Sequence, residues 1–439
     1  MKVFRDPVHN LITFDRESED LILKLIDTKE MQRLRRIKQL GLSSFTYPGA
    51  EHSRFAHSLG VTHLTKRMIE RISYSRDEQE IGWYKSIKDN YILALCAALL
   101  HDVGHGPFSH AIEKTIGIEH EKWTIQIITS ETEVKDILEG YKEGFSQEVA
   151  EVIKRVHPSK AIVKLLSSQL DADRIDYLMR DSIMTGAGYG RFDLEWLLNV
   201  IKIGQVNEPE IGLSLEKGLS IAEDFVMARY YMYKNVYFHK ATRSSEVIIN
   251  KIFERVKLLN SENKLDIPLE LKNLLISDDE KLDNIDDYLQ LDDHYLWYCF
   301  SLWSKSSDSV LADLCSRIMK RNLLKSISID GMDLNKLMSN IYTLKEEASK
   351  SNPLLANLVY TDTPATSCYK DNYILSSVSN NSEAQEEASE QIFLFDKNNK
   401  AYELSTVSEI INTIRNKPLQ WQRLYYPKEL KEIVQKVFD

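Results

Sequence analysis

The sequence is short of cysteine, of glycine and proline, and of long apolar runs, and each shortage excludes a class of protein. Its 439 residues contain four cysteines and no C-x-x-C pair, so we expect reduced thiols rather than a disulfide-stapled extracellular domain. The longest apolar run, residues 91–100, is half as long as a membrane-spanning helix and predicts a buried helix. The first residues carry charge where a secretion signal has apolar residues, which predicts a cytoplasmic protein.

Positive charge is also in short supply. Lysine and arginine total 56 against 66 acidic residues, which gives a formal net charge of −10. A protein that coats nucleic acid needs a positive field, so strong nucleic-acid binding is not expected. A small phosphorylated ligand stays open, because it needs only a local cluster of cations.

The sequence does have helical periodicity, which predicts a mainly α fold with short β-hairpins. The hairpins are expected over 2–15 and over 200–215, the second turning at 207–209. The expected helices are 18–40, 54–74, 91–102, 108–114, 120–130, 133–139, 145–155, 159–182, 193–200, 218–260 and 309–322.

The composition changes near the end of the chain. Residues 377–391 are polar and acidic and predict an exposed mobile loop between strand-like runs at 372–376, 391–395 and 401–404. We therefore expect a small C-terminal α+β lobe. The predicted divisions are a hairpin and helix (1–45), a helical core (46–260), a helical extension (261–360) and the lobe (361–439).

Histidine and aspartate residues of metal-ligand type fall where core-facing side chains are expected. On the helix that begins at Arg54, the step of about 100° per residue puts His57 on the apolar face. His63 falls on another face of the same helix and is expected to be solvated. A single buried histidine is more often an ordinary core residue than a ligand, so His57 needs partners.

Two further segments supply such partners. The apolar helix from residue 91 ends in His101-Asp102, whose polar side chains would be costly to bury without a shared ion. Asp173 begins a helical stripe with Tyr177 and Asp181. Two imidazoles and two carboxylates favour a transition metal over calcium, and the sequence does not distinguish Mn, Fe, Zn, Ni or Mg.

Several separate motifs carry a resemblance to a known family. They are residues 31–41 (MQRLRRIKQLG), 47–50 (YPGA), 53–60 (SRFAHSLG), 101–110 (HDVGHGPFSH), 120–121 (HE) and 173–177 (DRIDY). Together they resemble the HD-domain deoxynucleoside triphosphate (dNTP) triphosphohydrolases over roughly residues 1–250. The resemblance implies that 46–260 is a phosphohydrolase core whose divalent metal is held by His57, His101, Asp102 and Asp173.

The resemblance also implies the roles of residues around the metal. Three histidines match catalytic positions near the α-phosphate, with His110 the expected proton donor to the leaving 5′-oxygen: His105, His110 and His120. Residues that match contacts to the sugar, base or phosphates are Gln39, Leu40, Arg54, Arg174, Tyr177, Asp181, Arg229 and Tyr237. By spacing alone, Arg229, Tyr233, Tyr237 and Lys240 share a helix face. Core packing is the ordinary interpretation of such an aromatic stripe, but its two cations favour a solvated face turned to an anionic ligand.

Regulation is implied in the same way. Lys2, Val3, Asp27, Gln32 and Arg35 match a guanine-nucleotide activator site, for GTP or dGTP, of family members that form homotetramers. An exposed ion pair is the alternative for Asp27 and Arg35. The positions that depart from the family's patterns are Arg5, Leu215, Ile221 and Phe238, so the activating nucleotide and the base preference stay open.

Three hypotheses about function remain at this point. The first is hydrolysis of a dNTP to deoxynucleoside and tripolyphosphate. The second keeps the HD chemistry but changes the substrate to a nucleotide monophosphate or a signalling nucleotide. The third is a nucleotide-sensing or single-strand-binding scaffold, which the complete set of ligand and catalytic residues disfavours.

Overall fold

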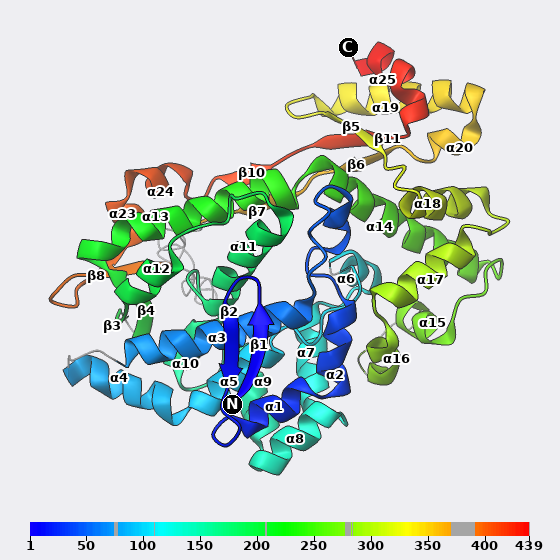
Figure 1. Ribbon diagram of the computed structural model, residues 1–439. Coiled ribbons are helices and arrows are strands. Elements are labelled where there is room, and N and C mark those ends of the chain that lie inside the picture. Colours follow the sequence, from blue (N-terminus) through cyan, green and yellow to red (C-terminus); the bar gives the residue numbers. More distant parts are fainter. Residues whose placement is uncertain are drawn as a thin grey trace.

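The computed structural model of the chain describes residues 1–73, 78–108, 110–206, 209–276, 282, 284–369 and 391–438. The fold is mainly α with short hairpins, as the periodicity predicted (Figure 1). Its helices are α1 (Asp20–Ile26), α2 (Lys29–Arg33), α3 (Arg54–Ile72), α4 (Glu78–Asp89), α5 (Tyr91–Leu100), α6 (His110–Ile116), α7 (His120–Thr129), α8 (Glu133–Tyr141), α9 (Phe145–Ile153), α10 (Lys160–Leu166), α11 (Ala172–Thr185), α12 (Leu194–Val200), α13 (Leu215–Met232), α14 (Lys240–Ser261), α15 (Leu269–Ile276), α16 (Ile285–Gln290), α17 (Asp293–Trp303), α18 (Ser309–Met319), α19 (Leu334–Ser351), α20 (Pro353–Ala356), α23 (Leu404–Val407), α24 (Glu409–Ile414) and α25 (Lys431–Phe438).

Among the described residues, the strands form four small sheets. Strands β1 and β2 make the N-terminal hairpin, β7 pairs with β10, β11 lies between β5 and β6, and the fourth sheet has the order β3-β4-β8-β9. Their bounds are β1 (Lys2–Asp6), β2 (Asn10–Phe14), β3 (Ile201–Gln205), β4 (Pro209–Ser214), β5 (Lys325–Ser328), β6 (Tyr360–Asp362), β7 (Ala365–Ser367), β8 (Phe393–Phe395), β9 (Ala401–Glu403), β10 (Pro418–Gln420) and β11 (Arg423–Tyr426).

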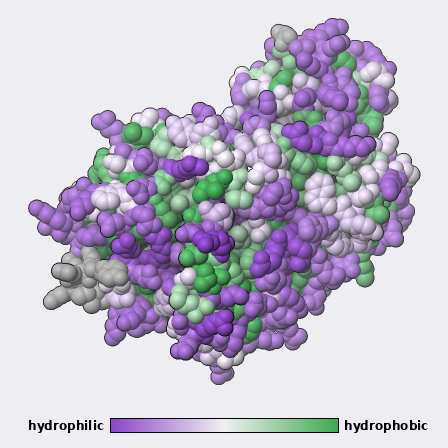
Figure 2. Space-filling view, in the orientation of Figure 1, coloured by the Kyte–Doolittle hydropathy of each residue, from purple (hydrophilic) through white to green (hydrophobic). Residues whose placement is uncertain are grey.

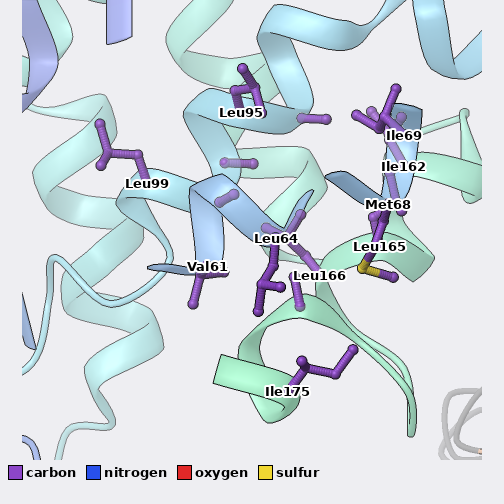
Figure 3. Packing of buried hydrophobic residues seen from close by; sticks show 14 of the residues in the cluster. Val61, Leu64, Met68, Ile69, Leu95, Leu99, Ile162, Leu165, Leu166 and Ile175 are labelled. Carbon is purple, nitrogen blue, oxygen red and sulfur yellow. The ribbon is translucent and has the colours of Figure 1, made fainter. Parts of the chain in front are cut away.

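The central helices pack around α3 and α5. In Figure 3, Val61, Leu64 and Met68 of α3 lie against side chains of α5, α10 and α11. Every residue of α5 from Leu93 to Leu100 is buried, which confirms that the apolar run is a core helix. Hydrophilic residues cover most of the face seen in Figure 2, with smaller apolar patches between them. The core therefore fixes the start of α3, the end of α5 and the first turn of α11 relative to one another.

Three helices that the periodicity predicted as continuous are interrupted, and a capping residue accompanies each break. The helix expected over 18–40 ends at Ile26, and the Thr28 side chain accepts from the Met31 N–H to begin α2. The helix expected over 159–182 breaks before Asp171, which caps α11 through the Arg174 N–H. The helix expected over 218–260 passes through a π-turn at Tyr233–Tyr237 before α14 begins. Side chains that compete for backbone N–H groups explain the first two differences, and at the third His239 caps α14 after the π-turn by accepting from the Ala241 N–H.

The end of the chain contributes to two regions. Strand β8 runs parallel to β4, so part of the last 80 residues completes the sheet of the 200–215 hairpin. Strand β11 pairs with β5 and β6, and α19 and α25 pack beside them at the end of the molecule opposite the N-terminus (Figure 1). The predicted loop at 377–391, the strand-like run at 372–376 and most of the turn at 207–209 lie outside the described residues.

Cysteines and hydropathy agree with the first expectations. All four cysteines are buried free thiols. Among the described residues, no helix combines the length and the apolar character that crossing a membrane requires.

Candidate metal centre

Three side chains from three helices converge on one point. The Nε2 atom of His57, in the first turn of α3, lies 3.0 Å from Oδ1 of Asp173, in the first turn of α11. The Nε2 atom of His101, just after α5, lies 3.7 Å from the same carboxylate oxygen. These three atoms lie close enough together to hold one metal ion. The structure therefore brings together three of the four ligands that the sequence predicted.

The hydrogen bonds behind the two imidazoles suit a metal. Nδ1 of His57 is 2.8 Å from Oδ2 of Asp176, and Nδ1 of His101 is 2.8 Å from the carbonyl oxygen of Ala98. Both partners are acceptors, so each Nδ1 carries a proton and Nε2 is the atom of each ring that can bind a metal ion once its own proton is displaced. Nε2 of His101 is buried and has no hydrogen-bond partner among the described residues. Two inward Nε2 atoms beside a carboxylate are a donor set that fits a divalent cation.

Asp102 lies between this group and a second one. Its carboxylate oxygens are 3.4 Å from Nε2 of His101 and 3.8 Å from Nε2 of His57. The Arg54 guanidinium donates to Oδ2 of Asp102 at 2.5 Å, and Nε2 of His105 lies 3.3 Å from Oδ1. Arg54 thus neutralises Asp102 in this structure, so a metal ion would share that carboxylate with an arginine.

The charges around His57, His101 and Asp173 favour a bound cation. Burial lowers the pKa of the His57 imidazole, but the carboxylates of Asp173 and Asp176 outweigh burial and raise that pKa to about 10. Burial opposes ionisation of Asp173, yet His101 and His57 hold its pKa well below the usual range. Because buried carboxylates need compensation, the site favours positive charge as either protons or a metal ion.

The predicted catalytic histidines form a pair next to Asp102. The rings of His105 and His120 stack with their centroids 3.7 Å apart, and Nδ1 of His120 lies 2.9 Å from Oε1 of Glu113. Burial, and then the nearby Arg54 cation, lower the pKa of His105 well below its usual value, so its imidazole is neutral. The side chain of His110 lies outside the described part of the structure. A neutral imidazole beside a carboxylate, as at His105, is suited to accept a proton.

The residues predicted to contact a sugar gather around Asp181 on α11. This carboxylate is 1% exposed, and its two oxygens lie 2.8 Å from Nε2 of His52 and 2.8 Å from the hydroxyl of Tyr237. The rings of Tyr177 and Tyr237 make an edge contact at 6.3 Å. The backbone N–H of Gln39 donates to the carbonyl of His52, which brings Gln39 and its neighbour Leu40 to the same place. The sugar-contact set is therefore one spatial cluster.

Two arginines line the space beside the metal group. Arg174 lies at the edge of a narrow cleft of about 120 Å³ that His101, Asp102, His120 and Asp173 also line. It also lines a neighbouring hollow of about 520 Å³ together with Arg229, Gln169 and residues of β7. Nη1 of Arg229 donates to Oε1 of Gln169 at 2.6 Å. The hollow thus offers two guanidinium groups to an anionic ligand.

Of the predicted activator residues, some face a hollow and others do not. Lys2 and Asp27 line a space of about 400 Å³ with Phe4, Arg16 and Asp20. Arg35 instead donates to Oε1 of Gln32 and stacks 3.7 Å from the ring centroid of Phe55, and Val3 is exposed. The structure brings Lys2 and Asp27 together at one hollow.

Sequence reasoning missed three residues that orient the site. They are Asp176, which is hydrogen-bonded to His57; His52, which is hydrogen-bonded to Asp181; and Glu113, which is hydrogen-bonded to His120. Asp176 stands three residues after Asp173, one helical turn on, and this spacing was the available signal. The positions of His52 and Glu113 give no such signal, because their contacts cross between separate segments.

One histidine is placed differently from its prediction. His63 is half-buried, and its ring centroid lies 5.2 Å from that of His9 in the N-terminal hairpin. The expectation that it is solvated is wrong, because the hairpin covers that face of α3. Burial lowers the pKa of His63 to about 4, and the neighbouring His9 and Arg67 act in the same direction.

This pKa predicts a pH dependence of stability. An unfolded chain protonates His63 near pH 6.5, so between about pH 6.5 and 4 the unfolded state binds more protons. Stability due to this group is therefore lost as pH falls through that window, by on the order of 2 kcal/mol. Urea unfolding of the wild type and of His63→Gln at pH 7.5 and 4.5 isolates the effect. An equal stability difference between the two proteins at both pH values would contradict it.

The comparisons with known proteins agree with this site. Residues 54–181 match the family model described as HD domain, and residues 200–439 match the model described as HD associated region. The HD match begins at Arg54 and ends at Asp181, so it spans the candidate ligands. HD domains bind divalent metals, and His57, His101 and Asp173 form a group within this domain that could hold one.

Individual relatives extend the likeness. The chain is 40% identical over 431 residues to the uncharacterized protein YwfO of Bacillus subtilis, covering 98% of this chain and 93% of that protein. It is 32% identical over 287 residues to a deoxynucleoside triphosphate triphosphohydrolase SAMHD1 homolog of Dictyostelium discoideum, covering 62% of this chain and 53% of that protein. A phosphohydrolase structure from Bacteroides thetaiotaomicron superposes with a TM-score of 0.78 at 27% identity, covering 97% of this chain and 99% of that one. The chain therefore belongs to the HD-domain phosphohydrolase family, with the HD associated region following its HD domain.

Proposed function

We propose that this phosphohydrolase converts dNTPs to deoxynucleosides and tripolyphosphate. The metal would be held by His57, His101 and Asp173, with Asp102 completing the set. Similarity to dNTP triphosphohydrolases of several eukaryotes supports the substrate class.

The arrangement along α11 is the observation that carries the proposal. Asp173 belongs to the metal group, Arg174 lines the cleft and the larger hollow, and Asp181 lies in the His52 and Tyr237 cluster. Eight residues of helix separate Asp173 from Asp181, about 12 Å along the axis. That spacing is on the scale of a nucleoside phosphate. A group that can bind metal and phosphate therefore lies at one end of this stretch of α11, and a polar cluster that can contact a sugar lies at the other.

The residues have distinct parts in the proposed reaction. Arg174 and Arg229 bind the phosphates, and the Asp181 carboxylate accepts a hydrogen bond from the 3′-hydroxyl. Water adds to the α-phosphorus, the bond to the 5′-oxygen breaks, and that oxygen takes its proton from a histidine, for which His110 is proposed. When bound, a divalent metal supplies Lewis-acid polarisation of the phosphoryl group and activation of water.

Product identification tests the proposal. Purified protein with Mn²⁺ or Mg²⁺ is incubated with each dNTP, with and without GTP or dGTP, and the products are separated by ion-exchange chromatography. We expect equal amounts of deoxynucleoside and tripolyphosphate. Release of single phosphate would favour an HD phosphohydrolase of another nucleotide, and no product from all four dNTPs with mixed activators would contradict the proposal.

We also propose that a guanine nucleotide activates the enzyme at the Lys2 and Asp27 hollow. A carboxylate accepts hydrogen bonds from the N1 and N2 donors of guanine, whereas an amide offers one acceptor fewer. Asp27→Asn is therefore expected to raise the GTP concentration for half-maximal activation by about tenfold, the effect of about 1.4 kcal/mol. Asp136→Asn, an exposed aspartate on α8, is the matched control. An unchanged activation curve for Asp27→Asn would refute this site.

Assembly belongs to the same proposal, because activator sites of this kind lie at subunit interfaces. We propose a homotetramer. Light scattering coupled to size-exclusion chromatography, with and without GTP, measures the mass directly. A mass of one 50.9 kDa chain under both conditions would contradict it.

A further inference from the structure

We propose that the N-terminal hairpin is part of the metal centre, and that His9 in its turn is a positioning residue for the metal ligand His57. The two histidines share one acceptor, the buried carboxylate of Asp176. Nε2 of His9 lies 2.6 Å from Oδ1 of Asp176, and Nδ1 of His57 lies 2.8 Å from Oδ2. An ionised carboxylate only accepts hydrogen bonds, so both histidines donate to it.

The orientation of Asp176 is determined by donors on both of its oxygens. Arg180, one turn further along α11, donates to Oδ2 at 2.8 Å and to Oδ1 at 3.0 Å. The side chains of His9 and Asp176 are each 0% exposed. A buried carboxylate with this many donors has one favourable orientation, and that orientation aims the His57 ring.

The hairpin contributes a second contact through Asp6, the last residue of β1. Its carboxylate accepts from Arg180 at 2.8 Å and 3.3 Å, and its Oδ1 also accepts from the backbone N–H groups of Val8 and His9. Asp6 therefore shapes the turn that presents His9 and also anchors the arginine that holds Asp176. The hairpin and α11 meet in one buried ionic network behind the metal ligand.

This network gives the hairpin a role in metal binding that strand pairing alone does not explain. Partners behind a metal-binding histidine fix its tautomer and ring direction, and losing them costs about 10–100-fold in metal affinity. Without the His9 donor, Asp176 keeps His57 and Arg180 as partners, but its Oδ1 loses the shorter of its two hydrogen bonds and keeps only the one from Arg180 at 3.0 Å. His57 should then bind the ion with lower affinity, although no ligand atom has been removed.

Metal affinity, measured without any nucleotide, tests the proposal independently of the substrate. The variants are His9→Leu, which removes the donor, and His9→Gln, whose amide can still donate to Asp176. His294→Leu, an exposed histidine on α17, is the matched control. The affinity for Mn²⁺ is obtained by competition with a chelator, and the absorption spectrum of the Co²⁺-loaded protein reports imidazole ligation.

We expect His9→Leu to bind Mn²⁺ at least about tenfold more weakly and to change the Co²⁺ spectrum. His9→Gln should stay within about threefold of the wild type, and the control should be unchanged. If His9→Leu does not fold, Asp6→Asn replaces it, because it weakens the same network with an isosteric side chain and should also bind Mn²⁺ more weakly. Wild-type affinity and spectrum in a folded His9→Leu or Asp6→Asn protein would overturn the proposal.

Discussion

Asp173→Asn is expected to remove hydrolytic activity almost completely, lowering kcat by roughly a thousandfold or more, which corresponds to about 4 kcal/mol. The carboxylate of Asp173 lies 3.0 Å from Nε2 of His57 and 3.7 Å from Nε2 of His101. An amide of the same shape keeps the packing but takes away the charge. The metal ion then loses an anionic ligand, and the reaction loses the ion's polarising effect.

Two measurements separate this outcome from unfolding. Metal content per chain, determined by mass spectrometry, should fall together with kcat, whereas the circular dichroism spectrum of the variant should remain that of the folded wild type. Asp193→Asn is the matched control, since Asp193 is an exposed N-cap of α12 and asparagine caps helices equally well. Full metal occupancy together with wild-type kcat in Asp173→Asn would show that the ion is held elsewhere.

The candidate metal ligands could be proposed from the sequence because each lies at a recognisable position in a regular element. His57 follows from the apolar face of α3, His101 and Asp102 from the end of a wholly apolar helix, and Asp173 from the first turn of α11. Periodicity depends only on residues that are close in sequence, so it predicts the buried face of a helix correctly wherever that helix forms. The same reasoning failed across residues 18–40, where Thr28 competes for backbone N–H groups.

Contacts between distant segments could not be predicted in this way. His9 and Asp176 are 167 residues apart in sequence, and β8 pairs in parallel with β4 about 180 residues earlier. Neither pairing produces a periodic pattern in the sequence, because each depends on how separate helices and strands pack against one another. The misplaced His63 has the same cause, since helix geometry shows which face it occupies but not that a hairpin covers that face.

The network behind His57 leads to the second large effect, at Gly60. Alanine normally stabilises a helix relative to glycine by about 1 kcal/mol. At Gly60 of α3, however, an added Cβ would lie 1.9 Å from Oδ1 of Asp176 and 2.5 Å from a guanidinium nitrogen of Arg180. Neither side chain can move away from the added methyl group. Asp176 is hydrogen-bonded to His57 and His9, and Arg180 is hydrogen-bonded to Asp6.

Gly60→Ala is therefore expected to destabilise the protein by about 3–5 kcal/mol, the cost of disrupting a buried ionic network, and to weaken metal binding as well. Gly140→Ala in α8 is the matched control, because among the described residues no atom outside its own stretch of helix backbone lies within 4 Å of the added Cβ. That variant should be stabilised by about 0.5 kcal/mol. Chemical unfolding of the two metal-free variants measures both changes in the free energy of unfolding. The expected result is a decrease for Gly60→Ala and an increase for Gly140→Ala. If Gly60→Ala proved as stable as Gly140→Ala, Asp176 and Arg180 would have to be free to move, and His57 would not be held by a rigid network.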